Sequence, residues 1–322
     1  MKKALVIRLG AFGDMIFTTP LLKKLKQDGY HITMYVSSYG HDVIKLNPNV
    51  NKFIVHDSKL KGQEIWKHWE EIGNQYDRVI NLSGSIEQSL LKEEGTEAFY
   101  WPKDKRHAEC NINYQDKTME VGGYPDERGL SGELHFSQFE LSEARRFRNK
   151  YNKYFVVLWA LSGSSFHKAY PYTEFVQKAL LRKYPDIMFW NIGDTFCEIL
   201  DIPHEERIKN YAGKWPIRKA LAMTRFADVV VGAETGILNA ASCFNTHKII
   251  MLSHSSEENL TKYWTNTTVL IPDAICHPCH RLIYTLEACP LDKTFNAPIC
   301  TMIEPVKMFY AIEHIYQERK NK

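Results

Sequence analysis

The sequence predicts an α/β protein built from two doubly wound parallel sheets, one in each half of the chain. Its 322 residues suffice for two domains of about 100–200 residues each. Short apolar runs alternate with helical patterns in both halves, which is typical of parallel strands joined by helices. Polar turns follow several of these runs, at the positions where such sheets bind ligands.

The first half opens on the apolar run KALVIR at residues 3–8, which we interpret as a buried strand. A turn with two glycines follows, and we expect a helix from Pro20 to Gln27 because proline suits the first turn of a helix. Three further strands and one helix are expected in this half: strands at residues 32–37, 52–56 and 77–82, and a helix at residues 66–76.

The second half repeats this alternation from Tyr154 onward, after a helix near residues 140–151. Four strands and three helices are expected: strands at residues 155–161, 187–192, 228–231 and 248–252, and helices at residues 172–184, 217–226 and 237–243. Apolar residues at helical spacing predict a last, amphipathic helix over residues 304–318. We place the domain boundary near residues 150–153, which gives domains of residues 1–150 and 151–303 and a terminal helix within residues 304–322.

Composition excludes several classes of protein. The net charge of +3 is too small to indicate nucleic acid as a partner. No apolar stretch reaches the roughly 20 residues of a membrane-spanning helix, so we expect at most peripheral membrane contact. The N-terminus runs directly into a strand and does not resemble a signal peptide, which favours a cytoplasmic protein.

The first turn with candidate chemistry is Leu9–Asp14. Its glycines, Gly10 and Gly13, allow the backbone to approach a ligand, but their spacing is not that of the dinucleotide fingerprint G-x-G-x-x-G. Asp14 follows near the start of a helix. Two interpretations stay open for its carboxylate, a catalytic base or a helix cap.

A second polar turn, Ser162–Pro171, follows the strand expected at residues 155–161. The hydroxyls of Ser164 and Ser165 and the ammonium of Lys168 together suit a diphosphate. The alternative interpretation is a polar surface loop that contains a lysine.

A third turn, Gly232–Gly236, joins a strand to a helix. Glu234 and Thr235 lie where the N–H groups of a helix start attract anions, and a carboxylate there can accept hydrogen bonds from sugar hydroxyls. The alternative is that one of the two caps an ordinary strand-to-helix turn.

Three segments resemble glycosyltransferase family 9, the family of ADP-heptose:lipopolysaccharide heptosyltransferases. They are ALVIRLGAFGDMIFTTPLLKKLK at the start, Lys168–Pro171, which is similar to a K-x-[WY]-P segment, and ADVVVGAETGILNAAS, which is similar to an A-D-x-x-[VI]-x-x-D-T-G-x-x-H-x-A signature. The segments occur in order over most of residues 1–255. The resemblance implies the GT-B fold, in which two Rossmann-like domains face a central cleft.

The resemblance also implies roles for single residues. Asp14 matches the proposed general base that deprotonates the acceptor hydroxyl, and Lys168 matches the lysine that holds the donor phosphates. The other matches are donor-binding positions, namely Gly13 in the first turn, Ser164 and Ser165 in the second, and Thr235 and Gly236 in the third.

Two positions depart from the family pattern. Glu234 stands where the family has an aspartate, and Asn239 stands where it has a histidine. Both fall where the donor sugar and phosphates bind, so we keep both as donor-binding candidates and leave the identity of the sugar open.

The stretch after the strand expected at residues 248–252 adds three candidate donor contacts, His254, Ser255 and Asn259. The alternative is a helix start, in which Ser255 or Ser256 is the cap and Asn259 lies in the first turn.

Four of the seven cysteines lie close together in the sequence, namely Cys276, Cys279, Cys289 and Cys300. In a cytoplasmic protein such a cluster favours a metal over disulfides, and four thiolates suit a structural zinc or iron site without an open position for catalysis. Unrelated thiols and disulfides are the alternatives, and His277 and His280 are alternative ligands in place of a cysteine. The segment is similar in kind to the cysteine-ligated iron motif of bacterial autotransporter heptosyltransferases, which favours iron over zinc and a protein over a lipid acceptor without deciding either.

With the resemblance, the sequence predicts an inverting glycosyltransferase that uses no catalytic metal. It would move a heptose from ADP-heptose to a glycan, lipopolysaccharide or protein acceptor. Three alternatives stay open: a transferase for another nucleotide sugar, a nucleotide-sugar-binding protein without activity but with a structural metal site, and a thiol-rich metal or redox protein on a Rossmann-like scaffold. The missing dinucleotide fingerprint argues against an oxidoreductase.

Overall fold

The computed structural model describes residues 1–60, 62–83, 101–163, 168–200, 205–281, 289 and 298–321. The chain divides into two compact units, Met1–His135 and Phe136–Lys322. This division precedes the boundary predicted near residues 150–153, because helix α6 (Gln138–Asn149) packs against helix α8 (Ile217–Met223) of the second unit.

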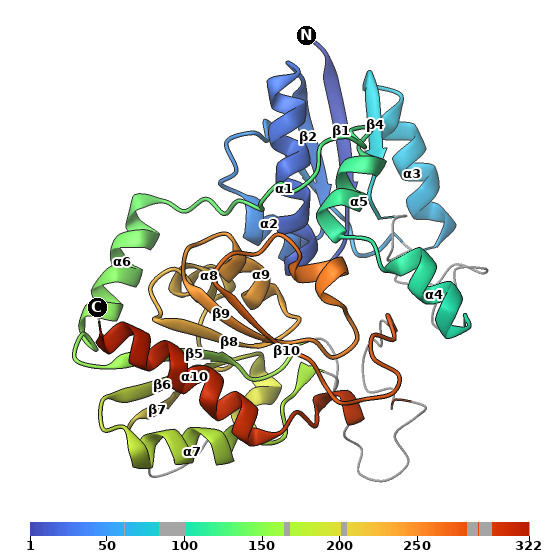
Figure 1. Ribbon diagram of the computed structural model, residues 1–322. Helices are drawn as coiled ribbons and strands as arrows, with labels where there is room; N and C mark the ends of the chain where they lie inside the picture. The colour runs from blue at the N-terminus through green and yellow to red at the C-terminus, as the bar shows by residue number, and fades with distance from the viewer. Residues whose placement is uncertain are drawn as a thin grey trace. The chain divides into compact units, whose positions relative to one another are not determined.

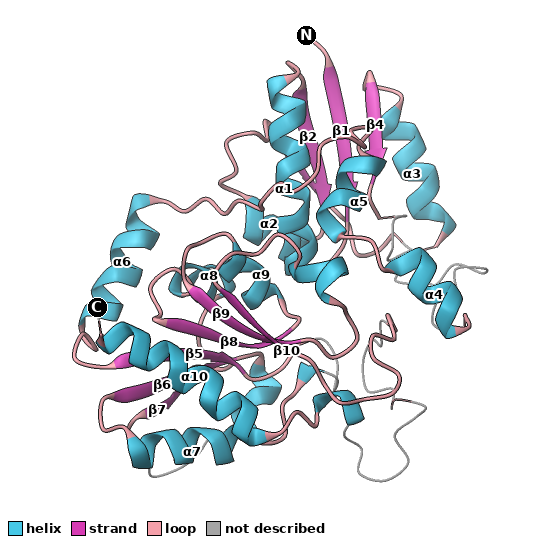
Figure 2. Ribbon diagram, viewed as in Figure 1, coloured by secondary structure: helices cyan, strands magenta, loops and turns pink. Residues whose placement is uncertain are grey.

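The first unit is built on a parallel sheet of four strands in the order β3-β2-β1-β4 (Figures 1 and 2). The strands are β1 (Lys3–Arg8), β2 (His31–Val36), β3 (Lys52–Val55) and β4 (Arg78–Asn81). The order reverses between β1 and β4, so the chain after β1 and the chain after β4 emerge next to each other. In open parallel sheets ligands bind at such a reversal.

Helix α1 (Phe12–Gln27) begins eight residues before Pro20, so the predicted helix start at Pro20 is wrong. Proline lacks the N–H group that would bond to the carbonyl of Ile16, four residues earlier. The hydroxyl of Thr19 donates to that carbonyl instead (2.7 Å). This replacement explains how the helix continues through Pro20.

Four more helices complete the described part of the first unit: α2 (Ser38–Ile44), α3 (Gln63–Gly73), α4 (Lys103–Cys110) and α5 (Tyr114–Val121). Helices α2 and α5 pack against α1. On the other side of the sheet, Trp69 of α3 joins a buried cluster with Leu5, Ile7 and Tyr35. The sheet is therefore covered on both faces, as the sequence predicts.

The second unit holds a parallel sheet of six strands in the order β10-β9-β8-β5-β6-β7. Its strands are β5 (Phe155–Ala160), β6 (Ile187–Ile192), β7 (Ile208–Asn210), β8 (Val229–Ala233), β9 (His247–Met251) and β10 (Thr267–Leu270). This is the strand order of a Rossmann fold, and it reverses between β5 and β8. The short strands β7 and β10 at the two edges were not predicted.

Helices α7 (Thr173–Lys183) and α10 (Pro305–Lys320) pack together and bury their apolar residues against one face of this sheet (Figure 1). The core there includes Trp159 and Phe189, both with no exposed surface. Helix α9 (Gly236–Ser242) packs on β8, β9 and α8. None of the helices in the described ranges combines the length and apolar character that a membrane span requires.

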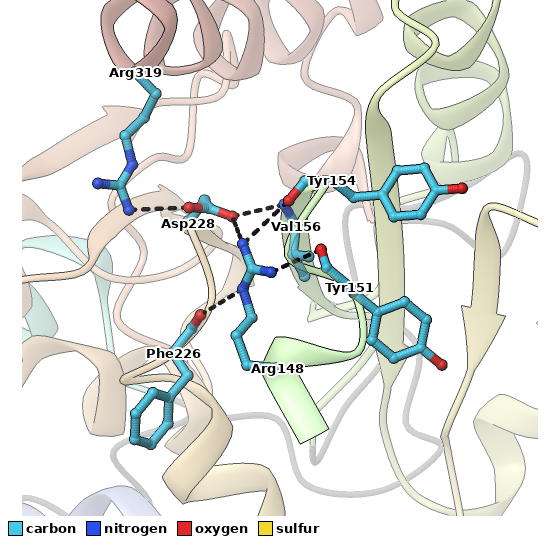
Figure 3. A network of polar contacts seen from close by, with 7 residues as sticks. All are labelled: Arg148, Tyr151, Tyr154, Val156, Phe226, Asp228 and Arg319. Carbon is cyan, nitrogen blue, oxygen red and sulfur yellow. Dashed lines mark hydrogen bonds and ion pairs between the residues drawn. The ribbon is translucent and has the colours of Figure 1, made fainter. Parts of the chain in front are cut away.

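A polar network joins α6, β5, β8 and α10 at the amino ends of the central strands (Figure 3). Asp228 accepts hydrogen bonds from Arg148 (2.6 Å), from Arg319 (2.9 Å) and from the N–H group of Val156 (2.8 Å). The guanidinium of Arg148 also donates to the carbonyls of three residues, Phe226, Tyr151 and Tyr154, at 2.8–3.1 Å. We call these contacts the Asp228 network.

Candidate functional site

The turn after β1 carries a buried ion pair in the first unit. Arg8, the last residue of β1, lies 3.1 Å from Asp14 through Nη2 and Oδ1, and both side chains are at least nine-tenths buried. A second nitrogen of Arg8 donates to the carbonyl of Leu82, just after β4. The N–H group of Leu9 donates to Ser83 Oγ (3.0 Å). The predicted base therefore lies at the strand-order reversal of its sheet.

The other carboxylate oxygen of Asp14 accepts the N–H group of Ala11, the N-cap of α1. Asp14 is the third residue of the helix, so it caps the helix start, as one of the two sequence interpretations expects. Gly10 makes this arrangement possible, because a Cβ at this residue would lie 2.2 Å from Asp14 Oδ2. Gly13 is buried in the first turn of α1.

The two loops at the reversal of the second sheet meet at Gly163. A Cβ at Gly163 would lie 2.7 Å from Cδ of Lys168 and 3.0 Å from Cγ2 of Thr235. These two side chains therefore pack over the same glycine, although 67 positions separate them in the sequence (235 − 168). Ser164 and Ser165, the other predicted residues of this loop, lie outside the described residues.

Tyr170, two residues after Lys168, has a structural role in the motif K-x-[WY]-P. Its ring stacks on Trp159 with centroids 6.3 Å apart, and its hydroxyl donates to the carbonyl of Ile303 (2.9 Å), just before α10. Tyr170 thus fixes the end of the loop that carries Lys168.

Glu234, directly after β8, binds the turn that follows β9. Ser253 Oγ donates to Oε2 (2.7 Å), and the N–H groups of His254 and Ser255 donate to Oε1 (3.0 and 3.1 Å). Nδ1 of His254 lies 3.1 Å from the same oxygen. We call residues 253–255 the β9 turn. Its backbone is held by a single carboxylate that is itself 6% exposed.

Burial raises the pKa of Glu234, but the charges of His254 and Lys168 and the hydrogen bonds of the β9 turn outweigh it and hold the pKa below its ordinary value. Burial also lowers the pKa of His254, with Lys168 adding to the effect and Glu234 opposing it. Glu234 is therefore a carboxylate. Since a carboxylate only accepts, the imidazole hydrogen is on Nδ1.

Two buried polar atoms beside this cluster have no hydrogen-bond partner among the residues that the structure describes. They are Oγ1 of Thr235 and Oδ1 of Asn239, in side chains that are each 7% exposed. Thr235 precedes α9, and Asn239 lies one turn later on the same helix. A buried polar atom without a partner costs about 1–3 kcal/mol, so such atoms in a native site call for a partner, either a ligand or an ordered water.

Asn259 takes part in a capping box with Ser256. Its side chain accepts from the N–H group of Ser256 (3.2 Å), and its own N–H donates to Ser256 Oγ (3.0 Å), which is a capping box. The geometry thus matches the capping interpretation of this stretch. Gly236 begins α9, which has seven residues.

The cysteines of the predicted metal site are near one another without forming a closed cluster. Among the described residues, no three His, Cys, Asp or Glu side chains are grouped closely enough to hold a metal. Burial raises the pKa of the Cys300 thiol, and the other three cysteines and Glu234 raise it further. The four thiols therefore lie within electrostatic range, and none of the seven cysteines forms a disulfide.

Sequence reasoning missed two residues that organise these sites, Arg8 and Ser253. Arg8 ends a strand directly before a glycine turn, which is a usable signal for a residue that faces a ligand site. Ser253 has no such signal, because its bond to Glu234 depends on the pairing of β8 with β9.

Two units, each a doubly wound parallel sheet with polar residues at its strand-order reversal, place the protein in the class of two-domain Rossmann-like α/β folds. Comparison with solved structures places the fold within this class as GT-B. A family 9 glycosyl transferase from Veillonella parvula matches with a TM-score of 0.72 at 15% identity, covering 98% of each chain. The Escherichia coli ADP-heptose lps heptosyltransferase II matches with a TM-score of 0.68 at 13% identity, covering 99% of this chain and 100% of that one.

A third match is TibC of enterotoxigenic Escherichia coli, described as a dodecameric iron-containing heptosyltransferase in complex with ADP-D-β-D-heptose. Its TM-score is 0.64 at 10% identity, covering 100% of this chain and 79% of that one. No family model and no curated protein matches the sequence. The predicted GT-B fold is thus confirmed, by likeness of structure.

Proposed function

We propose that this protein is a glycosyltransferase that takes its sugar from a nucleoside-diphosphate sugar. One observation carries the proposal. Lys168 and the uncompensated atoms of Thr235 and Asn239 lie at the strand-order reversal of a Rossmann-like sheet, in a fold shared with family 9 glycosyltransferases. A cation and a buried hydroxyl without a partner fit a diphosphate, which is anionic and accepts hydrogen bonds.

Each side chain has a distinct part in donor binding. The ammonium of Lys168 pairs with the diphosphate, and the hydroxyl of Thr235 donates to one of its oxygens. Oδ1 of Asn239 accepts a hydrogen bond from a sugar hydroxyl, because an amide oxygen is an acceptor. Ser164, Ser165, Gly236, His254 and Ser255 complete the proposed donor site. Glu234 takes part through the β9 turn, since its four short contacts are all with that turn.

The proposed reaction is a single displacement with inversion. Asp14 accepts the proton of the acceptor hydroxyl, and that oxygen bonds to the anomeric carbon. The bond from this carbon to the donor phosphate breaks, and its electron pair stays on the diphosphate. Lys168 stabilises the negative charge that the leaving group gains. The reaction as proposed needs no catalytic metal.

We take ADP-heptose as the donor and a glycan, lipopolysaccharide or protein as the acceptor. The resemblance of the three sequence segments supports the donor, as do the neighbours named as ADP-heptose heptosyltransferases. Another nucleotide sugar is the alternative donor, because Glu234 and Asn239 stand where glycosyltransferase family 9 has an aspartate and a histidine. The other candidate function is a nucleotide-sugar-binding protein without transferase activity. The two functions differ in whether Asp14 acts as a catalytic base.

A thermal-shift panel of ADP-, GDP- and UDP-sugars tests the proposal. Binding to the folded state at 100 times the dissociation constant raises the free energy of unfolding by about 2.7 kcal/mol. We expect ADP-heptose to raise the melting temperature, and Lys168→Ala to abolish that increase. A panel in which no nucleotide sugar stabilises the protein would contradict the proposal.

Asp14→Asn tests the base. The amide keeps the shape of the side chain but cannot accept the proton, so kcat should fall by about 10²–10⁴-fold while donor affinity stays the same. Full activity of Asp14→Asn would remove Asp14 from the reaction.

We also propose a structural iron or zinc site on Cys276, Cys279, Cys289 and Cys300. Thiolates are the ligands of such sites, and the mutual effect on the Cys300 thiol supports their proximity. Reduced cysteines fit a cytoplasmic protein, which is the location we propose. Metal analysis of the purified protein and of Cys276→Ser tests the site, since a protein without stoichiometric metal would refute it.

A further inference from the structure

The segment that contains Cys276 and Cys279 is bonded directly to the β9 turn. Nε2 of His277 lies 2.9 Å from the carbonyl oxygen of Ser255, and the N–H group of His280 donates to the carbonyl of His254 (2.9 Å). Since a carbonyl only accepts, Nε2 of His277 carries the hydrogen. Residues 274–281, which we call the cysteine segment, thus hold two carbonyls of the turn.

Glu234 holds the N–H side of the same turn. Its carboxylate accepts from the backbone of His254 and Ser255 and from the hydroxyl of Ser253. The β9 turn is therefore fixed from two sides, with its donors on Glu234 and its acceptors on the cysteine segment. Movement of the cysteine segment would shift the partners of Glu234.

The residue that donates to the His254 carbonyl, His280, has an unfavourable backbone conformation. Its φ of 50° lies in the left-handed region, which costs a non-glycine residue about 1–2 kcal/mol. The residue is 7% exposed. Packing and the bond to His254 therefore outweigh the cost, and the segment has a defined position on the turn.

We propose that the cysteine segment is a positioning element of the donor site. It acts through His277 and His280 on the β9 turn, and through Glu234 on the diphosphate position at Lys168. The proposal rests on the proposed function, since it assumes that a nucleoside diphosphate binds there. It assigns to His277 a role that metal ligation by the cysteines does not include.

A reciprocal effect follows from this connection. If docking of the cysteine segment favours diphosphate binding, diphosphate binding must stabilise the docked segment by the same free energy. Two independent readouts are therefore available, ADP affinity and hydrogen exchange of the segment's own amides. Both can be measured whatever metal the cysteines bind.

The test compares the wild type with His277→Ala and His277→Gln. The glutamine amide can donate to the Ser255 carbonyl in place of Nε2, whereas alanine cannot. We expect His277→Ala to weaken ADP binding, measured by titration calorimetry, by about 5- to 10-fold, in the lower part of the range for coupled sites. His277→Gln should restore most of the affinity. His314→Ala, at an exposed histidine on α10, is the matched control and should bind ADP as the wild type does.

Hydrogen exchange of residues 274–281 gives the second readout. ADP should slow this exchange in the wild type and in His277→Gln, and have little effect in His277→Ala. Equal ADP affinity in wild type and His277→Ala, or exchange that ADP leaves unchanged in a wild type shown to bind ADP, would overturn the inference alone. A folded wild type that does not bind ADP would overturn the proposed function as well.

Discussion

The two ends of the six-stranded sheet both carry polar clusters, and they differ in how completely the polar atoms are paired. At the amino ends, Asp228 has three donors and Arg148 has four acceptors (Figure 3). At the carboxyl ends, Glu234 is equally well bonded, but Thr235 Oγ1 and Asn239 Oδ1 have no partner within the described part of the chain.

This difference separates stabilising groups from ligand-binding groups. A paired network lowers the free energy of the folded chain alone, whereas a buried atom without a partner raises it until a ligand arrives. Substitutions at the amino ends should therefore change stability and leave ligand binding intact. Substitutions of Thr235 and Asn239 at the carboxyl ends should do the reverse.

The largest effect is expected for Arg148→Ala. Removal of the guanidinium leaves the partly buried carboxylate of Asp228 with two of its three donors and takes one donor away from each of three carbonyls. The free energy of unfolding should therefore fall by about 3 kcal/mol. Urea denaturation measures this loss. Arg146→Ala on the same helix is the control, because its side chain is 72% exposed in a surface pair and should cost less than about 1 kcal/mol. Similar losses in both variants would contradict a stabilising role specific to the Asp228 network.

Lys168→Ala should have the largest effect on binding. Loss of the ammonium should weaken ADP binding about 100-fold, or about 2.7 kcal/mol, the scale of a charge-assisted contact. Lys178→Ala, which removes a surface pair with Glu174 on α7, controls for the loss of one positive charge. If both variants weaken binding equally, Lys168 acts only through net charge.

The ion pair of Glu140 with Arg218 also stabilises the fold, and its contribution depends on pH. The hydrogen bond from Arg218, followed by those from Ser137, holds the pKa of Glu140 at about 2 against the raising effect of burial. A lowered pKa stabilises the fold above the ordinary value of 4.5, and this contribution disappears as pH falls toward 2. Because the carboxylate is partly exposed, we expect about 2 kcal/mol. The free energy of unfolding, measured between pH 5 and pH 2, should show this loss of about 2 kcal/mol in the wild type and in the control variant Glu143→Gln. Glu140→Gln should not show it.

In the second unit, strands with continuous apolar character were predictable from the sequence, and the two short edge strands were not. The strand expected at residues 187–192 is β6, with the same bounds. Strands β7 and β10 have only three and four residues, and they are strands because β6 and β9 lie beside them. The helix start at Phe12 was missed because the Thr19 hydroxyl, which supports Pro20, acts only once the helix has formed.

Residues of the candidate site were predictable where a single loop contains a recognisable sequence motif. Asp14 and Lys168 belong to local motifs, and both lie at strand-order reversals. The bond between Glu234 and Ser253 could not be predicted, because it joins loops whose proximity depends on strand order. That Thr235 Oγ1 has no partner among the described residues is likewise a property of the folded structure and has no signal in the sequence.

Thr235→Val is the most direct measurement of the central claim, that unpaired atoms at the carboxyl ends await a nucleoside diphosphate. Valine keeps the shape and removes the hydroxyl. The account predicts that the melting temperature of the free protein stays constant or rises. The substitution removes Thr235 Oγ1, a buried atom whose burial costs free energy because no described residue bonds to it. The account also predicts that ADP binding weakens about 5- to 10-fold, or about 1 kcal/mol. A less stable Thr235→Val protein that binds ADP with unchanged affinity would contradict the claim.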